Sequence, residues 1–226
     1  MEAQPQAESH KARIVLVDDH PVVLLGLTYL INQEPDMMVC GEAKDAETAL
    51  KAIETLKPDL AIIDISLNGT SGLDLIQKTK TLWPELPILV LSMHDETLYA
   101  ERSLRAGALG YVMKQELTEK LVIAIRRVLE KEIYVSEKMS TTLLSKSIRG
   151  RRDKGSFSLE PLSDRELEIF LLIGRGYSTR QIAERVKLSA KTIQSHREHI
   201  KQKLKLKNAT ELLQCAFQRV RRLGSK

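Results

Sequence analysis

Five short apolar segments rich in Val and Ile recur along the first half of the chain, and apolar residues with helical spacing lie between them. The segments are RIVLVDD (13–19), MMVCGEA (37–43), LAIIDIS (60–66), PILVLSM (87–93) and GYVMK (110–114). Strands that alternate with helices of this length form a parallel sheet whose two faces are covered by the helices. The sequence therefore predicts an α/β doubly wound, five-stranded parallel sheet.

Polar residues stand where the predicted strands stop. Asp18 and Asp19 end the first segment, Asp64 lies near the end of the third, Ser92 near the end of the fourth, and Lys114 ends the fifth. Ligand sites of open parallel sheets lie beyond the carboxyl ends of the strands. Any one of these residues alone is most simply a chain-end residue facing water, but the five together predict a functional site.

The charges of these residues indicate the chemistry of the site. Three clustered carboxylates repel one another unless a cation lies among them, and oxygen ligands suit Mg²⁺. Lys114 supplies a positive charge that can hold a phosphoryl oxygen, and Ser92 can hydrogen-bond to the same group. We therefore expect Mg²⁺ as the cofactor and interpret Asp64 as a carboxylate nucleophile that becomes an aspartyl phosphate.

Charge is distributed unevenly along the chain. Residues 1–135 hold 14 Lys and Arg against 21 Asp and Glu, whereas residues 136–226 hold 21 against 9. An acidic first half joined to a basic second half predicts two domains with different partners, the second partner being nucleic acid. A stretch rich in Ser, Thr, Lys and Arg separates them and leaves room for a short helix around Met139. We place the first domain at 11–132, the linker at 133–157 and the second domain at 158–226.

Other features of the sequence indicate the cellular location of the protein. The first residues, MEAQPQAESHKA, lack the apolar stretch of a signal peptide, and no apolar run is long enough to span a bilayer. Cys40 and Cys215 lie far apart, each within an apolar pattern, so we interpret them as buried thiols. These features predict a cytoplasmic protein with no membrane partner.

The last 66 residues contain four helix starts and no Val- and Ile-rich strand, which predicts a small all-α four-helix domain. Two of the starts have the spacing of a capping box, Ser followed three residues later by Glu or Gln. Gly174 and Gly176 follow the first helix and predict left-handed caps. The residues expected to cap the four helices are Ser163, Ser178, Ser189 and Asn208.

The second and third of these helices, expected at 178–186 and 190–206, are joined by a very short turn. A pair of helices joined in this way is typical of a helix-turn-helix DNA reader. His196 and His199, in the second of the pair, have the i, i+3 spacing of a metal-binding pair. No Cys or third His accompanies them, so the sequence argues against a zinc site.

The residues at the strand ends, together with Tyr111, resemble the receiver domain of two-component response regulators. The resemblance implies a flavodoxin-like sheet and transfer of a phosphoryl group from a histidine kinase to Asp64. It further implies that Asp19, Asp64 and the Ser66 carbonyl bind Mg²⁺ directly and that Asp18 acts through water. Ser92, Tyr111 and Lys114 match the residues that contact the phosphoryl group or switch on phosphorylation.

One position departs from the receiver pattern. Many receivers have proline after the lysine, with a cis peptide bond, whereas this chain has Gln115. Because a cis bond before a residue other than proline costs roughly 3 kcal/mol, we expect a trans bond here.

The segment LSDRELEIFLLIGRGYSTRQIAERVKLSAKTIQSHREHIKQKL resembles the LuxR-type helix-turn-helix, so the whole chain resembles the NarL/FixJ subfamily of response regulators. The resemblance implies a homodimer on double-stranded DNA, with contacts through the last helix. It places Gln194, Ser195 and Glu198 toward base edges, where Gln suits adenine and Glu suits cytosine. Residues suited to phosphate contacts are Ser178, Lys191, Thr192, Arg197 and Lys201.

Two other functions compete with that of a phosphorylation-controlled transcription factor. A phosphatase of the haloacid dehalogenase type also has an aspartate nucleophile, but it carries a second Asp two residues later, where this chain has Ser66. This difference argues against turnover, so we expect no enzyme activity beyond the chain's own phosphotransfer and dephosphorylation. A receiver locked in one state, working through protein contacts alone, is disfavoured by the intact set of acids.

Overall fold

The computed structural model describes residues 11–67, 71–149, 159 and 161–224. The chain divides into two compact units, Met1–Leu144 and Ser145–Lys226, called here the N-terminal and C-terminal units. The division falls inside the predicted linker, of which residues 150–157 lie outside the described residues.

The N-terminal unit is built on a five-stranded sheet with the order β2-β1-β3-β4-β5, all of whose pairs are parallel. The predicted doubly wound sheet is confirmed, because the strand order reverses next to β1. The strands are β1 (Ala12–Val17), β2 (Met37–Ala43), β3 (Leu60–Asp64), β4 (Ile88–Ser92) and β5 (Gly110–Met113).

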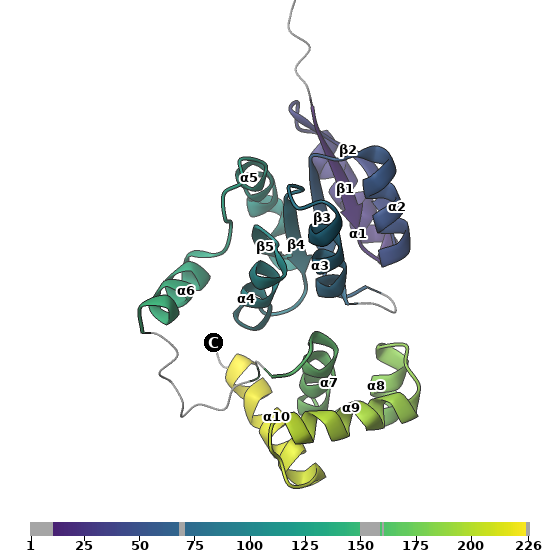
Figure 1. Cartoon of the computed structure of the whole chain (residues 1–226), viewed down its shortest axis with the longest axis vertical. Helices are drawn as coiled ribbons and strands as arrows, with labels where there is room; N and C mark the ends of the chain where they lie inside the picture. The colour runs from purple at the N-terminus through teal and green to yellow at the C-terminus, as the bar shows by residue number, and fades with distance from the viewer. Residues whose placement is uncertain (1–10, 68–70, 150–158, 160, 225–226) are drawn as a thin grey trace, which may run out of the picture. The chain divides into compact units, whose positions relative to one another are not determined.

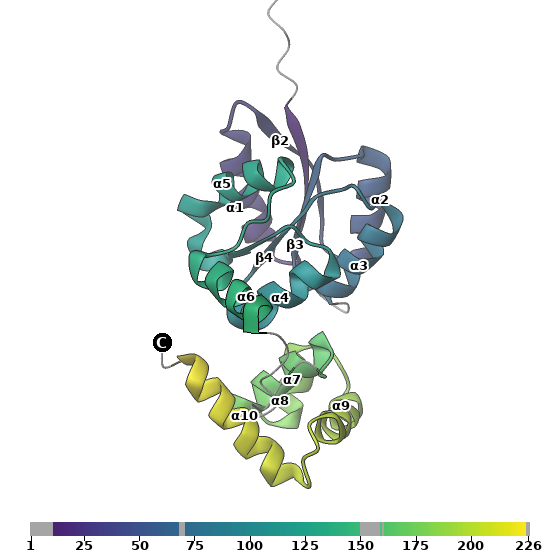
Figure 2. The ribbon, with the colours of Figure 1, turned by 60° about the vertical axis from the view of Figure 1, so that its left-hand side comes forward.

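Helices cover both faces of this sheet, with α1 and α5 on one face and α2, α3 and α4 on the other (Figures 1 and 2). The main core lies under α1 and α5, where Ile14 and Leu16 of β1 pack with Leu24 and Ile125. Both faces of the central strands are apolar, as parallel strands covered on two sides require. The helices are α1 (Pro21–Asn32), α2 (Ala46–Leu56), α3 (Gly72–Leu82), α4 (Glu96–Ala106) and α5 (Leu117–Leu129).

The chain that leaves α5 returns to the edge of the sheet. Tyr134 forms a parallel bridge with Gly110, where its amide donates to the Leu109 carbonyl and its carbonyl accepts from the Tyr111 amide, both at 2.9 Å. Helix α6 (Glu137–Arg149) follows, as the predicted linker helix. Its first turn is held to the N-terminal unit, because the Ser136 hydroxyl donates to Glu96 of α4 at 2.7 Å and Met139 is 1% exposed.

In the described part of the C-terminal unit, four helices follow the end of α6, which confirms the prediction of a small all-α domain. Both predicted capping boxes form, at Ser163 with Glu166 and at Ser178 with Gln181. Ser189 caps the third helix through the Thr192 amide, and Asn208 precedes the last. The helices are α7 (Asp164–Gly174), α8 (Thr179–Arg185), α9 (Ala190–Lys203) and α10 (Ala209–Gly224).

Only one of the two glycines at the end of α7 has the predicted left-handed backbone. Gly176 has φ +86°, but Gly174 is the last residue of the helix itself. A Cβ atom at Gly174 would lie 2.4 Å from the Ala216 carbonyl oxygen of α10. Gly174 therefore allows two helices to approach closely, a tertiary role that local sequence does not reveal.

Three further expectations concern the cysteines, the peptide bond before Gln115 and membrane-spanning helices. Cys40 and Cys215 are free and only half-buried, so the prediction of buried thiols was too strong. Residues Lys114–Glu116 form a 3₁₀ helix, and no cis peptide bond occurs in the described part of the chain, as expected from Gln115. Within the same residues, no helix is long and apolar enough to cross a bilayer.

Candidate functional site

The carboxyl ends of β1, β3 and β5 bring three of the predicted site residues into direct contact. Lys114, just after β5, places its Nζ atom 2.5 Å from Oδ2 of Asp18 and 2.7 Å from Oδ2 of Asp64. The three side chains are 2–5% exposed. The ammonium therefore bridges two buried carboxylates, the paired arrangement that makes buried charge tolerable.

The backbone around Asp64 is held by the start of α3. Ser71 caps that helix, and the Gly72 amide donates to the Ile65 carbonyl at 2.8 Å. A Cβ atom at Gly72 would lie 2.1 Å from the Asp64 carbonyl oxygen, so only glycine fits at this distance. The close contact of α3 with the end of β3 thus fixes where Asp64 is presented.

For both Asp64 and Lys114, burial and the neighbouring charges shift the pKa in opposite directions. Burial raises the pKa of Asp64 to about 6, although the Lys114 ammonium opposes the shift. Burial also works against the charge of Lys114, but Asp64 and Asp18 overcome it and raise the pKa of the ammonium above its usual range. The carboxylates therefore hold Lys114 positive, while Asp64 lacks full compensation for its own charge.

The donor set at this edge of the sheet fits a hard cation. Asp18, Asp19 and Asp64 each offer a carboxylate oxygen, and these atoms lie within 4.8 Å of one another together with a ring nitrogen of His20. Carboxylate oxygens are the ligands that Mg²⁺ prefers. The Ser66 amide donates to Oδ1 of Asp64 at 3.2 Å, which places Ser66 beside the predicted ion; binding through its carbonyl stays a prediction.

His20 was missed in the sequence. Its Nδ1 atom lies 3.1 Å from Oδ1 of Asp18 and 2.8 Å from Oδ1 of Asp19, and its amide donates to Oδ1 of Asp18 at 2.9 Å. The imidazole is 62% exposed and covers the solvent side of the two acids. Its position directly after the Asp pair was the one available signal.

The predicted switch residues Ser92 and Tyr111 meet at the backbone of His94. The His94 amide donates to the Ser92 hydroxyl at 3.1 Å, and the Tyr111 hydroxyl donates to the His94 carbonyl at 2.8 Å. Both side chains are buried, and burial raises the pKa of Tyr111, which stays a neutral phenol. The His94 ring, also missed in the sequence, lies 2.8 Å from the Ser66 hydroxyl and stacks on Tyr99.

Helix α9 presents most of the predicted base-reading and phosphate-contacting residues to solvent. Lys191, Gln194, Ser195 and Glu198 are exposed, while Ile193 and Ile200 are buried against the rest of the unit. An amphipathic helix with this division leaves its polar face available to a major groove.

Some of the predicted DNA contacts also have partners within the protein. Lys201 lies 2.8 Å from Glu198 and is 19% exposed, and Arg197 donates to Thr179 at 3.4 Å. The hydroxyl of Ser178 accepts from the Gln181 amide, and that of Thr192 lies 2.7 Å from the Ser189 hydroxyl. Each of these four residues is thus oriented by the fold before any DNA is bound.

Two protein families match the chain. The response regulator receiver domain matches residues 14–126, and the luxR family of bacterial regulatory proteins matches residues 160–216. The oxygen regulatory protein NreC of Staphylococcus epidermidis (strain ATCC 12228) is 38% identical over 212 residues, which cover 92% of this chain and 97% of that protein.

Two solved structures of related proteins are similar to this chain, one over most of its length and one over part of it. One is the RcsB response regulator of Salmonella enterica serovar Typhimurium bound to promoter rprA in the presence of the phosphomimetic BeF₃⁻. It is 29% identical, with a TM-score of 0.59, and the match covers 91% of this chain and 98% of that one. Another is a LuxR-family response regulator from Aurantimonas sp. SI85-9A1, 32% identical with a TM-score of 0.57 over 61% of this chain and 99% of that one.

Proposed function

Because the chain belongs to the NarL/FixJ subfamily of two-component response regulators, we propose that phosphorylation of Asp64 by a histidine kinase controls its binding to DNA. The observation that carries the proposal is the contact of Lys114 with both Asp18 and Asp64 at the carboxyl edge of the sheet. The C-terminal unit then binds specific DNA sequences and regulates transcription.

In the proposed reaction a carboxylate oxygen of Asp64 attacks the phosphorus of a phosphohistidine. The P–N bond breaks, its electron pair stays on the kinase imidazole nitrogen, and a proton from solvent completes the neutral imidazole. Lys114 neutralises phosphoryl oxygens, and the Ser92 hydroxyl hydrogen-bonds to one of them. Asp19, Asp64 and the Ser66 carbonyl would hold Mg²⁺, with Asp18 acting through water, and the ion would supply further positive charge at the phosphoryl oxygens. The chain catalyses only its own phosphorylation and dephosphorylation.

The role of Lys114 leads to a measurable prediction. Lys114→Ala should leave Mg²⁺ binding largely intact but slow phosphorylation by acetyl phosphate roughly a hundredfold, because a preorganised cation is lost. Calorimetry with Mg²⁺ and a time course of labelling measure the two properties. Lys120→Ala removes an exposed lysine that pairs with Glu116 and should label at the wild-type rate. A Lys114→Ala chain that is phosphorylated and activated like the wild type would show that the proposed site geometry is wrong.

We further propose that a homodimer reads two DNA half-sites. Leu213 and Phe217 of α10 are 48% and 57% exposed, which offers an apolar surface for a second copy. A solved structure of the related RcsB contains two dimers bound to two parallel DNAs, which supports this arrangement. The spacing of the half-sites should mirror the two-fold symmetry of the dimer.

Binding-site selection can test which residues of α9 read bases and which contact phosphates. Gln194→Ala should change the base preferred at one position of each half-site, because a good bidentate pair discriminates by roughly 1–3 kcal/mol. Lys201→Ala should weaken all sequences alike and reduce the log–log salt slope by roughly one unit. If Lys201→Ala changes the preferred sequence while Gln194→Ala only lowers affinity, the orientation of α9 in the groove is opposite to the proposed one.

A further inference from the structure

Two imidazoles and a carboxylate meet where α7 packs against α9, outside the site at the sheet edge. Glu166, His196 and His199 each offer one ligand atom, and these atoms lie within 4.8 Å of one another. We propose that the three residues form a binding site for Zn²⁺ or a similar borderline dication. The sequence argued against zinc because the histidine pair has no third ligand nearby, but folding brings Glu166 to it from a helix that begins 26 residues earlier than α9.

The surroundings of Glu166 and of one nitrogen of His196 support a bound ion. Glu166 is 3% exposed, and its Oε2 atom accepts from the Ser163 amide and from Nζ of Lys203, both at 2.7 Å. A carboxylate has about four lone-pair sites, so capacity for a further partner remains. Nδ1 of His196 is buried and has no hydrogen-bond partner in the described part of the chain. An orphaned buried nitrogen in a native fold indicates an unseen ion or water.

The types of ligand select the class of metal. Zn²⁺ binds histidine nitrogen and carboxylate oxygen, with water completing a tetrahedral set, whereas Mg²⁺ prefers oxygen alone. Ligand atoms on one tetrahedral zinc lie roughly 3.3 Å apart, as bond lengths of about 2.0–2.1 Å require. The three ligand atoms of the cluster lie within 4.8 Å of one another, and the exposed His199 side chain can change its rotamer to shorten its distance to the other two.

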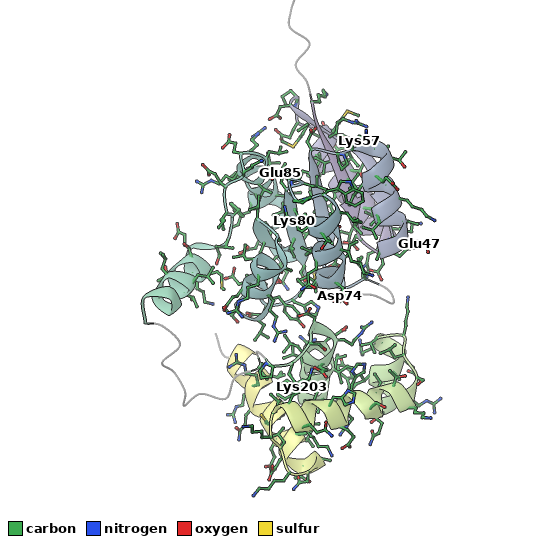
Figure 3. The ribbon with its side chains drawn as sticks, viewed as in Figure 1. Glu47, Lys57, Asp74, Lys80, Glu85 and Lys203 are labelled. Carbon is green, nitrogen blue, oxygen red and sulfur yellow. The ribbon has the colours of Figure 1, made fainter. Side chains whose placement is uncertain are left out.

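Lys203 is the competitor for the same carboxylate. This last residue of α9, labelled in Figure 3, has a side chain that is 41% exposed, so its ammonium can move into water when a dication takes its place. Arg165, another cation of α7, pairs with Glu168 at 2.7 Å. Zinc binding therefore exchanges one ion pair for a metal link between α7 and α9.

Zinc titration of the full chain against a chromophoric chelator tests this site. Because His20 and the three acids at the sheet edge can also bind zinc, every variant carries His20→Ala and Asp64→Asn. This background chain should bind one Zn²⁺, and His199→Ala should weaken that binding at least tenfold. Gln202→Ala removes an exposed neighbour on α9 that offers no strong metal ligand, and it should bind zinc like the background chain. Equal zinc affinity of the His199→Ala and Gln202→Ala chains, or no bound zinc in either, would overturn the proposal.

A second variant separates metal binding from a purely structural role of the cluster. Lys203→Gln removes the competing ammonium and should raise zinc affinity several-fold, even if it lowers the stability of the C-terminal unit. Zinc should also raise the unfolding temperature of that unit in the background chain, but not in His199→Ala. If Lys203→Gln binds zinc no more tightly than the background chain, the competition for Glu166, and with it the site, is refuted.

Discussion

Asp64→Asn is expected to abolish phosphorylation of the chain by acetyl phosphate in the presence of Mg²⁺. The substitution keeps the size of the side chain and its place at the end of β3, but the amide is no longer a nucleophile. Asp64 is buried and lies 2.7 Å from Lys114, the cation that would neutralise the incoming phosphoryl group. Mass spectrometry of the intact chain and of its peptides measures the effect. The wild type should carry one phosphoryl group on the peptide that contains Asp64.

The same strand supplies a matched control. Asp59 precedes β3 at its other end, where its carboxylate accepts from the Arg13 amide at 2.8 Å. Asp59→Asn should therefore be phosphorylated like the wild type. Undiminished labelling of Asp64→Asn would refute the assignment of the phosphoacceptor, and loss of labelling in both variants would point to a general defect of the fold.

Gly72→Ala should destabilise the N-terminal unit by about 3 kcal/mol, the upper range for forcing extra atoms into a packed site. The new Cβ atom would stand 2.1 Å from the Asp64 carbonyl oxygen and 2.7 Å from Cα of Ile65, and both of these are backbone atoms that move only with the strand. The single tryptophan, Trp83, lies at the end of α3 and reports unfolding of this unit in urea. Labelling by acetyl phosphate should slow as well, because Asp64 moves with its backbone.

Gly26 in α1 provides the comparison. A Cβ atom at this position meets nothing within 4 Å, so Gly26→Ala should stabilise the chain by roughly 0.5–1 kcal/mol through helix propensity. A Gly72→Ala chain that unfolds within about 0.5 kcal/mol of the wild type would contradict the close packing of α3 on β3.

The strands and the acids at their ends were predictable because their signals are local. An apolar run such as Leu60–Asp64 fixes a strand by itself, and the parallel arrangement then gathers the ends of all strands at one edge. His94 had no such signal. Its contacts with Ser66 and Tyr111 join residues that are 28 and 17 positions away along the chain, so these contacts exist only in the folded chain.

The ends of helices are also hard to predict when the sequence carries no local signal for them. The third helix of the C-terminal unit was expected to reach residue 206, but α9 stops at Lys203 and Lys205 takes a left-handed backbone with φ +56°. Lysine at such a position gives no local warning, since glycine or asparagine is the usual residue there. The role of Gly174 and the nearness of Glu166 to the histidine pair were likewise decided by packing between helices.

The pairing of Tyr134 with β5 has a consequence for how the N-terminal unit can be isolated. An uncovered edge strand presents free amides and carbonyls that recruit strands from other molecules, which leads to aggregation. The chain's own continuation occupies the Tyr111 amide and the Leu109 carbonyl at this edge. A fragment that ends at residue 132 would leave the Tyr111 amide and the Leu109 carbonyl without these partners. A fragment that extends past Met139 would keep β5 paired with Tyr134 and keep the Met139 side chain buried.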